Sequence, residues 1–152
     1  MSIAMTLHIL GVIVWVGGMF FAHMVLRPAL NDILEPPQRL PLLVRVFDGF
    51  FPWVWGAVLA ILASGFWMLF TLYEESIGLW VGFMSVVGVV MSAIFVFIYA
   101  IPYQRIGTAL KDDDKPKAVA AVGLIRQLIL VNLMLGLLVT VVAVAGKYGL
   151  FQ

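Results

Sequence analysis

The residues from Ile3 to Leu26 form an uninterrupted hydrophobic run, which Arg27 and Pro28 close. The run contains no Asp, Glu, Lys or Arg. At about 1.5 Å per residue, a helix of this length crosses the roughly 30 Å hydrocarbon core of a bilayer. The residues before it lack the basic stretch of a secretory signal peptide, and the run is longer than the apolar part of one. We therefore expect a membrane helix that is retained.

The composition of the whole chain is that of an integral membrane protein. Of its 152 residues, 64% are hydrophobic and 11% are charged, whereas a soluble domain is roughly one half apolar and one quarter charged. The length suits one compact bundle, so residues 1–152 are expected to form a single membrane domain. The net charge of +1 provides no basic field for nucleic acid. The absence of cysteine excludes disulfides, thiolate metal sites and cysteine nucleophiles.

Four hydrophobic segments are long enough to span a bilayer. They lie at about 3–26, 50–73, 79–101 and 118–145. Between Leu40 and Phe51, apolar residues recur at helical spacing around Arg45 and Asp48, which predicts a short interfacial helix before the second span. Pro102 is expected to end the third span. The predicted fold is an all-α antiparallel bundle of four transmembrane helices.

Basic residues are distributed unequally between the two sides of this bundle. On the side of both termini the basic side chain is Lys147. The opposite side, formed by the first and third connections, carries Arg27, Arg39, Arg45, Arg105, Lys111, Lys115 and Lys117. The positive-inside rule therefore predicts a multi-pass protein with both termini outside and the two long connections in the cytoplasm.

The first span places histidine, an ionisable residue, inside the membrane. Such a side chain is costly at membrane depth, and its default interpretation is functional. Counting about 1.5 Å per residue from the middle of each span, His8, Met68 and Met84 share a depth about 9–10 Å outward from the midplane. Met5 lies one turn further out on the face of His8. These four residues are candidate metal ligands. The alternative is a histidine that bonds a neighbouring helix, among methionines that only fill space.

A second set of residues shares a depth on the inner side, about 12–13 Å from the midplane. It comprises His23, Tyr99, Arg126 and Trp53. The position of His23 close to the headgroups favours an interfacial role over metal ligation. Arg126 is expected to snorkel or to pair with another group, and the binding of an anion is the alternative.

Small residues at helical spacing predict close packing between helices. Gly11 and Gly18 share a face with His8, which predicts that His8 looks into the bundle. The second span carries a ladder of small residues at Gly56, Ala60 and Ser64. We expect this ladder to face another helix.

Short motifs distributed over most of the chain form a recognisable set. They are His8 with Trp15-Val16-Gly17-Gly18, Arg27-Pro28-Ala29-Leu30, Phe50-Phe51-Pro52-Trp53-Val54-Trp55 followed by Ser64-Gly65, and Arg126 with Asn132 to Leu137. Together they resemble the CopD (copper-resistance protein D) family of membrane domains. The resemblance implies a four-helix domain associated with copper movement across the bacterial inner membrane. The related HemJ-type proteins, which are haem-binding protoporphyrinogen oxidases, also place a histidine in the first helix.

Copper is the ligand that the CopD resemblance implies. Cu(I) is soft and accepts imidazole and thioether ligands. His8 with Met5, Met68 or Met84 would therefore form a two- or three-coordinate site. Besides the lipid bilayer, the partners expected in this case are a second copy of the chain or a periplasmic copper-binding protein.

Haem b is the alternative ligand, and it needs one or two strong axial ligands. His8 would be an axial ligand, with Arg126 as a further cofactor-binding residue. No second histidine occurs on another span, which excludes two histidine ligands from one chain at mid-membrane. The HemJ pattern also uses a lysine inside a later span, and spans two and three contain none. Enzymatic activity is expected only in this alternative, as a haem-dependent oxidoreductase. The third hypothesis is a membrane subunit that binds no ligand.

Overall fold

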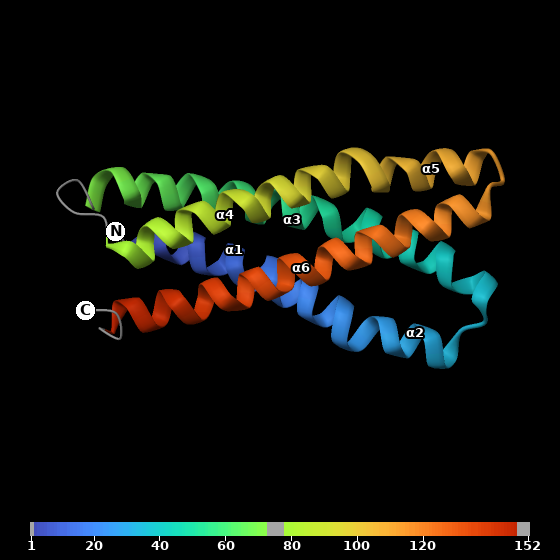
Figure 1. The fold of residues 1–152 in the computed structure, drawn as a ribbon, viewed down its shortest axis with the longest axis horizontal. Helices are drawn as coiled ribbons and strands as arrows, with labels where there is room; N and C mark the ends of the chain where they lie inside the picture. The colour runs from blue at the N-terminus through green and yellow to red at the C-terminus, as the bar shows by residue number, and fades with distance from the viewer. Residues whose placement is uncertain (1, 73–77, 149–152) are drawn as a thin grey trace.

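Four long helical segments run side by side along one axis, each antiparallel to the next in the chain (Figure 1). The computed structural model describes residues 2–72 and 78–148. Within these ranges, four segments are long and apolar enough to cross a membrane: Ile3–Ile33, Pro36–Thr71, Leu79–Lys111 and Lys115–Lys147. The predicted fold class, an all-α bundle of four membrane helices, is confirmed.

The first and third segments each contain a π-helical turn between two α-helices. The first consists of α1 (Ser2–Phe21), the π-helical turn η1 (Ala22–Leu26) and α2 (Arg27–Ile33). The third consists of α4 (Leu79–Ile98), the π-helical turn η2 (Tyr99–Tyr103) and α5 (Gln104–Lys111). The second and fourth segments are the single helices α3 (Pro36–Leu72) and α6 (Lys115–Lys147).

The expected short helix before the second span is not a separate element. Instead, α3 runs without a break from Pro36 to Leu72. Phe47 and Phe51 are both buried in the core of the bundle, and their rings stack at 5.3 Å. These two rings belong to the same core as the residues of the second span. The segment before the span is therefore part of the bundle and continues α3.

The helix of the third span does not end at Pro102. This proline lies in the turn η2, and the helix continues beyond it to Lys111. Proline lacks a backbone N–H, and a π-helical turn changes the hydrogen-bond pattern locally, so the helix can continue through this position. The residues that follow are held against α6, since Ile106 and Ala109 are buried.

The ladder of small residues on the second span is packed at Ser64 and open at Gly56, with Ala60 half-buried between them. Ser64 is buried, but Gly56 is exposed, and a Cβ atom there would have no neighbour within 4 Å. At 3.6 residues per turn, positions four apart rotate by about 40° at each step. Gly56 has therefore turned away from the packed face, on which Ala57 and Val58 are buried instead.

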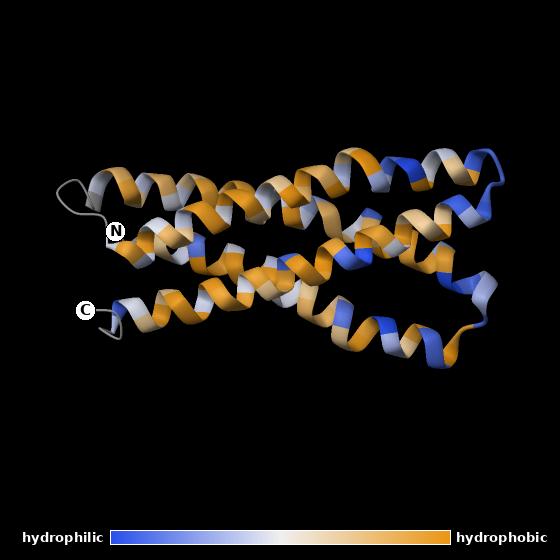
Figure 2. Ribbon diagram, viewed as in Figure 1, coloured by the Kyte–Doolittle hydropathy of each residue, from blue (hydrophilic) through white to orange (hydrophobic). Residues whose placement is uncertain are grey.

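The two ends of the bundle differ in polarity. Hydrophilic residues gather at the end where the connections from α2 to α3 and from α5 to α6 lie (Figure 2). The beginning of α1 and the end of α6 lie together at the opposite end (Figure 1). Between the ends, a core that includes Trp15, Phe51 and Phe95 joins the helices. The helix α1 packs mainly against α3, and α4 packs mainly against α6.

Candidate functional site

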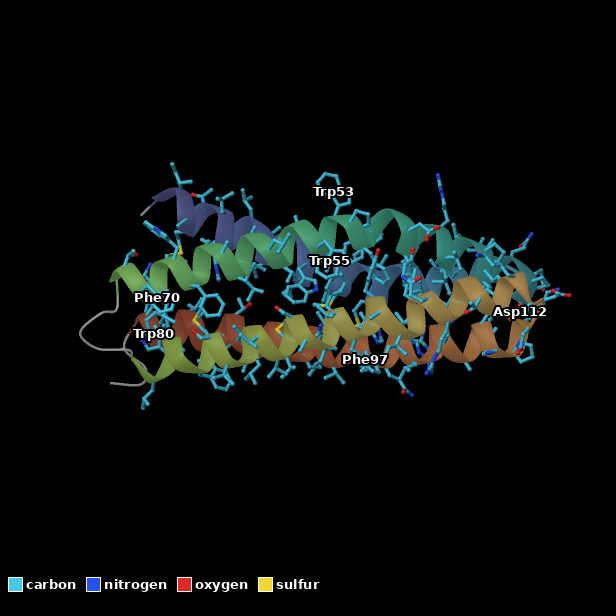
Figure 3. The ribbon with its side chains drawn as sticks, turned by 90° about the horizontal axis from the view of Figure 1, so that it is seen from above. Trp53, Trp55, Phe70, Trp80, Phe97 and Asp112 are labelled. Carbon is cyan, nitrogen blue, oxygen red and sulfur yellow. The ribbon has the colours of Figure 1, made fainter. Side chains whose placement is uncertain are left out.

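A cavity of about 450 Å³ lies between α1, α3, α4 and α6, in the half of the bundle where α1 begins. Met5, His8, Met68 and Met84, the candidate metal ligands, all line it. The rest of the lining is mainly apolar, and Trp80 lies at the end of the bundle where α1 begins (Figure 3). The structure therefore brings together four side chains from three helices.

Two acceptors on α3 hold the imidazole of His8. Its Nδ1 atom lies 3.2 Å from the backbone oxygen of Ile61 and 3.1 Å from Oγ of Ser64. Because a carbonyl oxygen can only accept, Nδ1 must carry the proton. The hydroxyl of Ser64 donates to the backbone oxygen of Ala60, so Oγ accepts from Nδ1. The neutral imidazole then has its lone pair on Nε2, which forms no hydrogen bond with the described residues.

Two glycines allow α1 and α3 to approach closely around His8. A Cβ atom on Gly65 would lie 3.2 Å from Cε1 of His8. A Cβ atom on Gly11 would lie 2.7 Å from Cγ1 of Ile61 and 3.0 Å from the backbone oxygen of Ala57. The prediction that His8 and Gly11 share a packed face is confirmed, and the opposing helix is α3.

The methionines of the cavity range from exposed to buried. Met5 is 39% exposed and Met68 only 9% exposed, while Met84 is half-buried. Met91, which is 4% exposed, also lines the cavity, although the sequence analysis did not select it. The spacing in the sequence could have identified Met91, since it follows Met84 by seven residues and thus lies on the same face of α4.

The comparison with protein-family models identifies one family. Residues 44–146 match the family described as CopD: Copper resistance protein D. The matched part is more than half of the chain. The chain belongs to the CopD family. No curated protein and no solved structure matches the chain.

The CopD match confirms the predicted resemblance and supports a copper-related membrane function. It covers most of α3 and continues into α6, so Met68, Met84 and Met91 lie inside it. The helix α1, which carries Met5 and His8, precedes the matched residues. Any role of His8 in this CopD-family chain therefore rests on its geometry.

The inner set of candidate residues does not form part of this cavity. His23 lies in η1, and Arg126 is exposed on α6. Tyr99 packs against the ring of Trp55 at 5.5 Å. Trp53 points away from the bundle (Figure 3). Arg126 thus does not lie beside His8, which separates the two residues suggested for haem binding in this CopD-family chain.

Within the described ranges, no group of three or more His, Cys, Asp or Glu residues could hold a metal ion. The donor atoms of the cavity are of another kind. They include the imidazole of His8 and the sulfur atoms of methionines, and the lining also contains the hydroxyls of Ser85 and Thr140 and the ammonium group of Lys147. Such nitrogen and thioether donors suit a soft monovalent ion such as Cu(I) better than Mg²⁺ or Ca²⁺.

Proposed function

We propose that this CopD-family chain binds Cu(I) in the cavity between its four helices and conducts the ion across the membrane. The observation that carries the proposal is the hydrogen bond from Nδ1 of His8 to the backbone oxygen of Ile61. It leaves the Nε2 lone pair for a ligand in a cavity that also contains Met5, Met68 and Met84. The family match supports copper as that ligand.

The arrangement around His8 is the one that metal-binding histidines commonly have. A histidine that ligates a metal usually donates its other ring N–H to a carbonyl or carboxylate, which fixes the ring and its tautomer. Here the acceptors are Ile61 and Ser64. In this proposal His8 is the principal ligand, and the thioethers of Met5, Met68 and Met84 complete a low-coordinate site.

The proposed orientation determines on which side of the membrane the cavity lies. If the termini face outward from the bacterial inner membrane, the cavity lies in the outer half of the bilayer. Met5, which is 39% exposed, then lies where Cu(I) enters. A periplasmic copper-binding protein would deliver the ion there. The chain could act alone or as a homo-oligomer.

Binding of Cu(I) by the purified protein tests the proposal. The measurement is anaerobic competition with a colorimetric Cu(I) chelator. We expect His8→Ala to abolish binding, because it removes the strongest donor of the cavity. His23→Ala is the matched control and should bind Cu(I) as the wild type does, since His23 does not line the cavity. Full binding by His8→Ala would overturn the proposal.

Haem b is the second ligand that the sequence analysis suggested. Neither the family match nor the position of Arg126 adds support for it. The absorption spectrum of the purified protein distinguishes the ligands, because bound haem produces a Soret band. A protein that shows no Soret band and binds no Cu(I) would instead fit the hypothesis of a subunit without a ligand.

A further inference from the structure

The helix faces that line the large cavity continue toward the middle of the bundle. On α1, the lining residues Met5, His8, Val12 and Trp15 recur at spacings of three and four, and Met19 is the next position on that face. The same continuation occurs on α4 and α6. The axis of the bundle therefore carries one series of inward-facing side chains beyond the large cavity.

A second, smaller cavity of about 20 Å³ lies on this continuation. Its lining consists of Trp15, Met19, Phe50, Phe51, Val54, Phe95, Ile98, Ile129 and Asn132. A space needs roughly 10–15 Å³ to contain one water molecule, so this cavity has room for one small occupant. Trp15 lines both cavities and lies between them.

Asn132 lines the small cavity, and only one of the two polar atoms of its side chain has a hydrogen-bond partner among the described residues. It is 1% exposed, and its Nδ2 atom donates to the backbone oxygen of Met91 at 3.1 Å. Its Oδ1 atom is buried and has no hydrogen-bond partner among the described residues. A buried acceptor without a partner costs about 1–3 kcal/mol. The structure retains this cost at a residue that lines a cavity.

Met19 supplies the second donor of the small cavity. It is 3% exposed, and it follows His8 on the same helix by eleven residues, or about three turns. Cu(I) accepts a thioether ligand. A cation near the midplane also loses its hydration, which an oriented carbonyl dipole can partly replace. Asn132 and Met19 together offer both contributions.

We propose that the small cavity is a second, transient position for Cu(I) on its path across the membrane. The sulfur of Met19 ligates the ion, and Oδ1 of Asn132 stabilises its charge. Trp15 separates this position from the large cavity and must move aside when the ion passes. This inference rests on the proposed function, because it assumes that Cu(I) enters by way of His8.

The experiment measures Cu(I) flux into liposomes that contain the purified protein, with a Cu(I) chelator trapped inside. Met19→Leu removes the sulfur, and Asn132→Leu removes the acceptor while retaining a similar volume. We expect each variant to lower the flux by about tenfold or more, the effect of losing one interaction with a desolvated charge. Cu(I) binding in the large cavity should stay unchanged, which also shows that the variant is folded.

Met134→Leu is the matched control. Met134 lies on α6 near Asn132 but is 59% exposed, so its sulfur does not face the bundle axis. Its variant should conduct as the wild type does. Wild-type flux in both Met19→Leu and Asn132→Leu would overturn the second position and leave water as the occupant of the small cavity. A wild type that binds Cu(I) through His8 but conducts none would overturn both the second position and the proposed conduction, and would leave the binding site at His8 standing. A wild type that binds no Cu(I) would refute both proposals.

Discussion

At the residue scale, the environment of His8 gives this side chain a defined chemical state. The backbone oxygen of Ile61 accepts from Nδ1, and a backbone oxygen cannot change its role. Ser64 adds a second acceptor, because its own hydroxyl proton is directed to Ala60. These bonds fix the tautomer of the neutral imidazole with its proton on Nδ1, and Nε2 forms no hydrogen bond with the residues that the structure describes. This state is the one that a metal ligand requires.

The first prediction concerns the acceptor Ser64. Ser64→Ala removes one of the two acceptors of the Nδ1 proton, and Ile61 still retains the other. We expect the Cu(I) affinity to fall by about tenfold, the lower end of the range for residues that orient a metal ligand. The measurement is competition with a Cu(I) chelator. Ser92→Ala is the control, since Ser92 bonds Gly88 in the same way but does not contact His8.

The second prediction concerns the space beside the imidazole. Gly65→Ala places a methyl group 3.2 Å from Cε1 of His8, so the ring must shift by a few tenths of an ångström away from its present position. We expect a loss of Cu(I) affinity of about tenfold, as for other changes that misorient a ligand. Gly56→Ala on the same helix meets no atom within 4 Å and should bind normally. Equal affinity in the two variants would contradict the position of His8 beside Gly65.

At the scale of single elements, the approach of α1 to α3 determines where His8 lies. Gly11 and Gly18 are the two positions on α1 where a side chain would collide with α3. At Gly18 the neighbour is the ring of Phe50, and at Gly11 it is Ile61 and the backbone of Ala57. Membrane helices associate through such small residues, because lipid provides no hydrophobic drive between helices. The histidine can therefore reach a backbone oxygen of the opposing helix.

The third prediction tests this contact. Gly11→Ala forces a methyl group against the backbone oxygen of Ala57 at 3.0 Å, and backbone cannot move aside as a side chain can. Overpacking of this kind costs about 1–3 kcal/mol. We expect a lower melting temperature in detergent. Gly17→Ala, whose Cβ would meet nothing within 4 Å, should melt as the wild type does. Identical melting of both variants would mean that the two helices are further apart.

At the scale of the whole molecule, the helices are longer than the membrane core. With its 37 residues, α3 extends over about 55 Å, against roughly 30 Å of hydrocarbon. The surplus length lies at the hydrophilic end of the bundle, where α2, the start of α3 and α5 carry polar residues (Figure 2). The large cavity lies toward the opposite end, where α1 begins.

The fourth prediction concerns the orientation, which the basic residues of the hydrophilic end suggest. The chain contains no cysteine, so single cysteines can be introduced without a background. Tyr148→Cys should react with an impermeant thiol reagent in intact cells, because Tyr148 is exposed at the end of the termini. Asp113→Cys, in the connection between α5 and α6, should react only after lysis. The reverse pattern would place the large cavity on the cytoplasmic side.

The sequence by itself determined the class of fold and much of the candidate site. A run of apolar residues of membrane length usually forms a helix, because the bilayer offers the backbone no hydrogen-bond partner. Counting along such helices gives depth, since the rise per residue is constant. That is why His8, Met68 and Met84, selected by depth alone, line one cavity. The ladder prediction holds at Ser64 and fails at Gly56, and the helix does not end at Pro102, because packing overrides local preference.

Only the tertiary structure decided which faces of the helices meet. Depth leaves the rotation of each helix open, and that rotation depends on contacts between residues far apart in the chain. The bond from His8 to Ile61 joins two such residues, and so does the bond from Asn132 to the backbone of Met91. Neither bond can be inferred from the spacing of residues within a single helix. Each bond occupies one polar atom of its side chain, and the other atom, Nε2 of His8 or Oδ1 of Asn132, has no hydrogen-bond partner among the described residues.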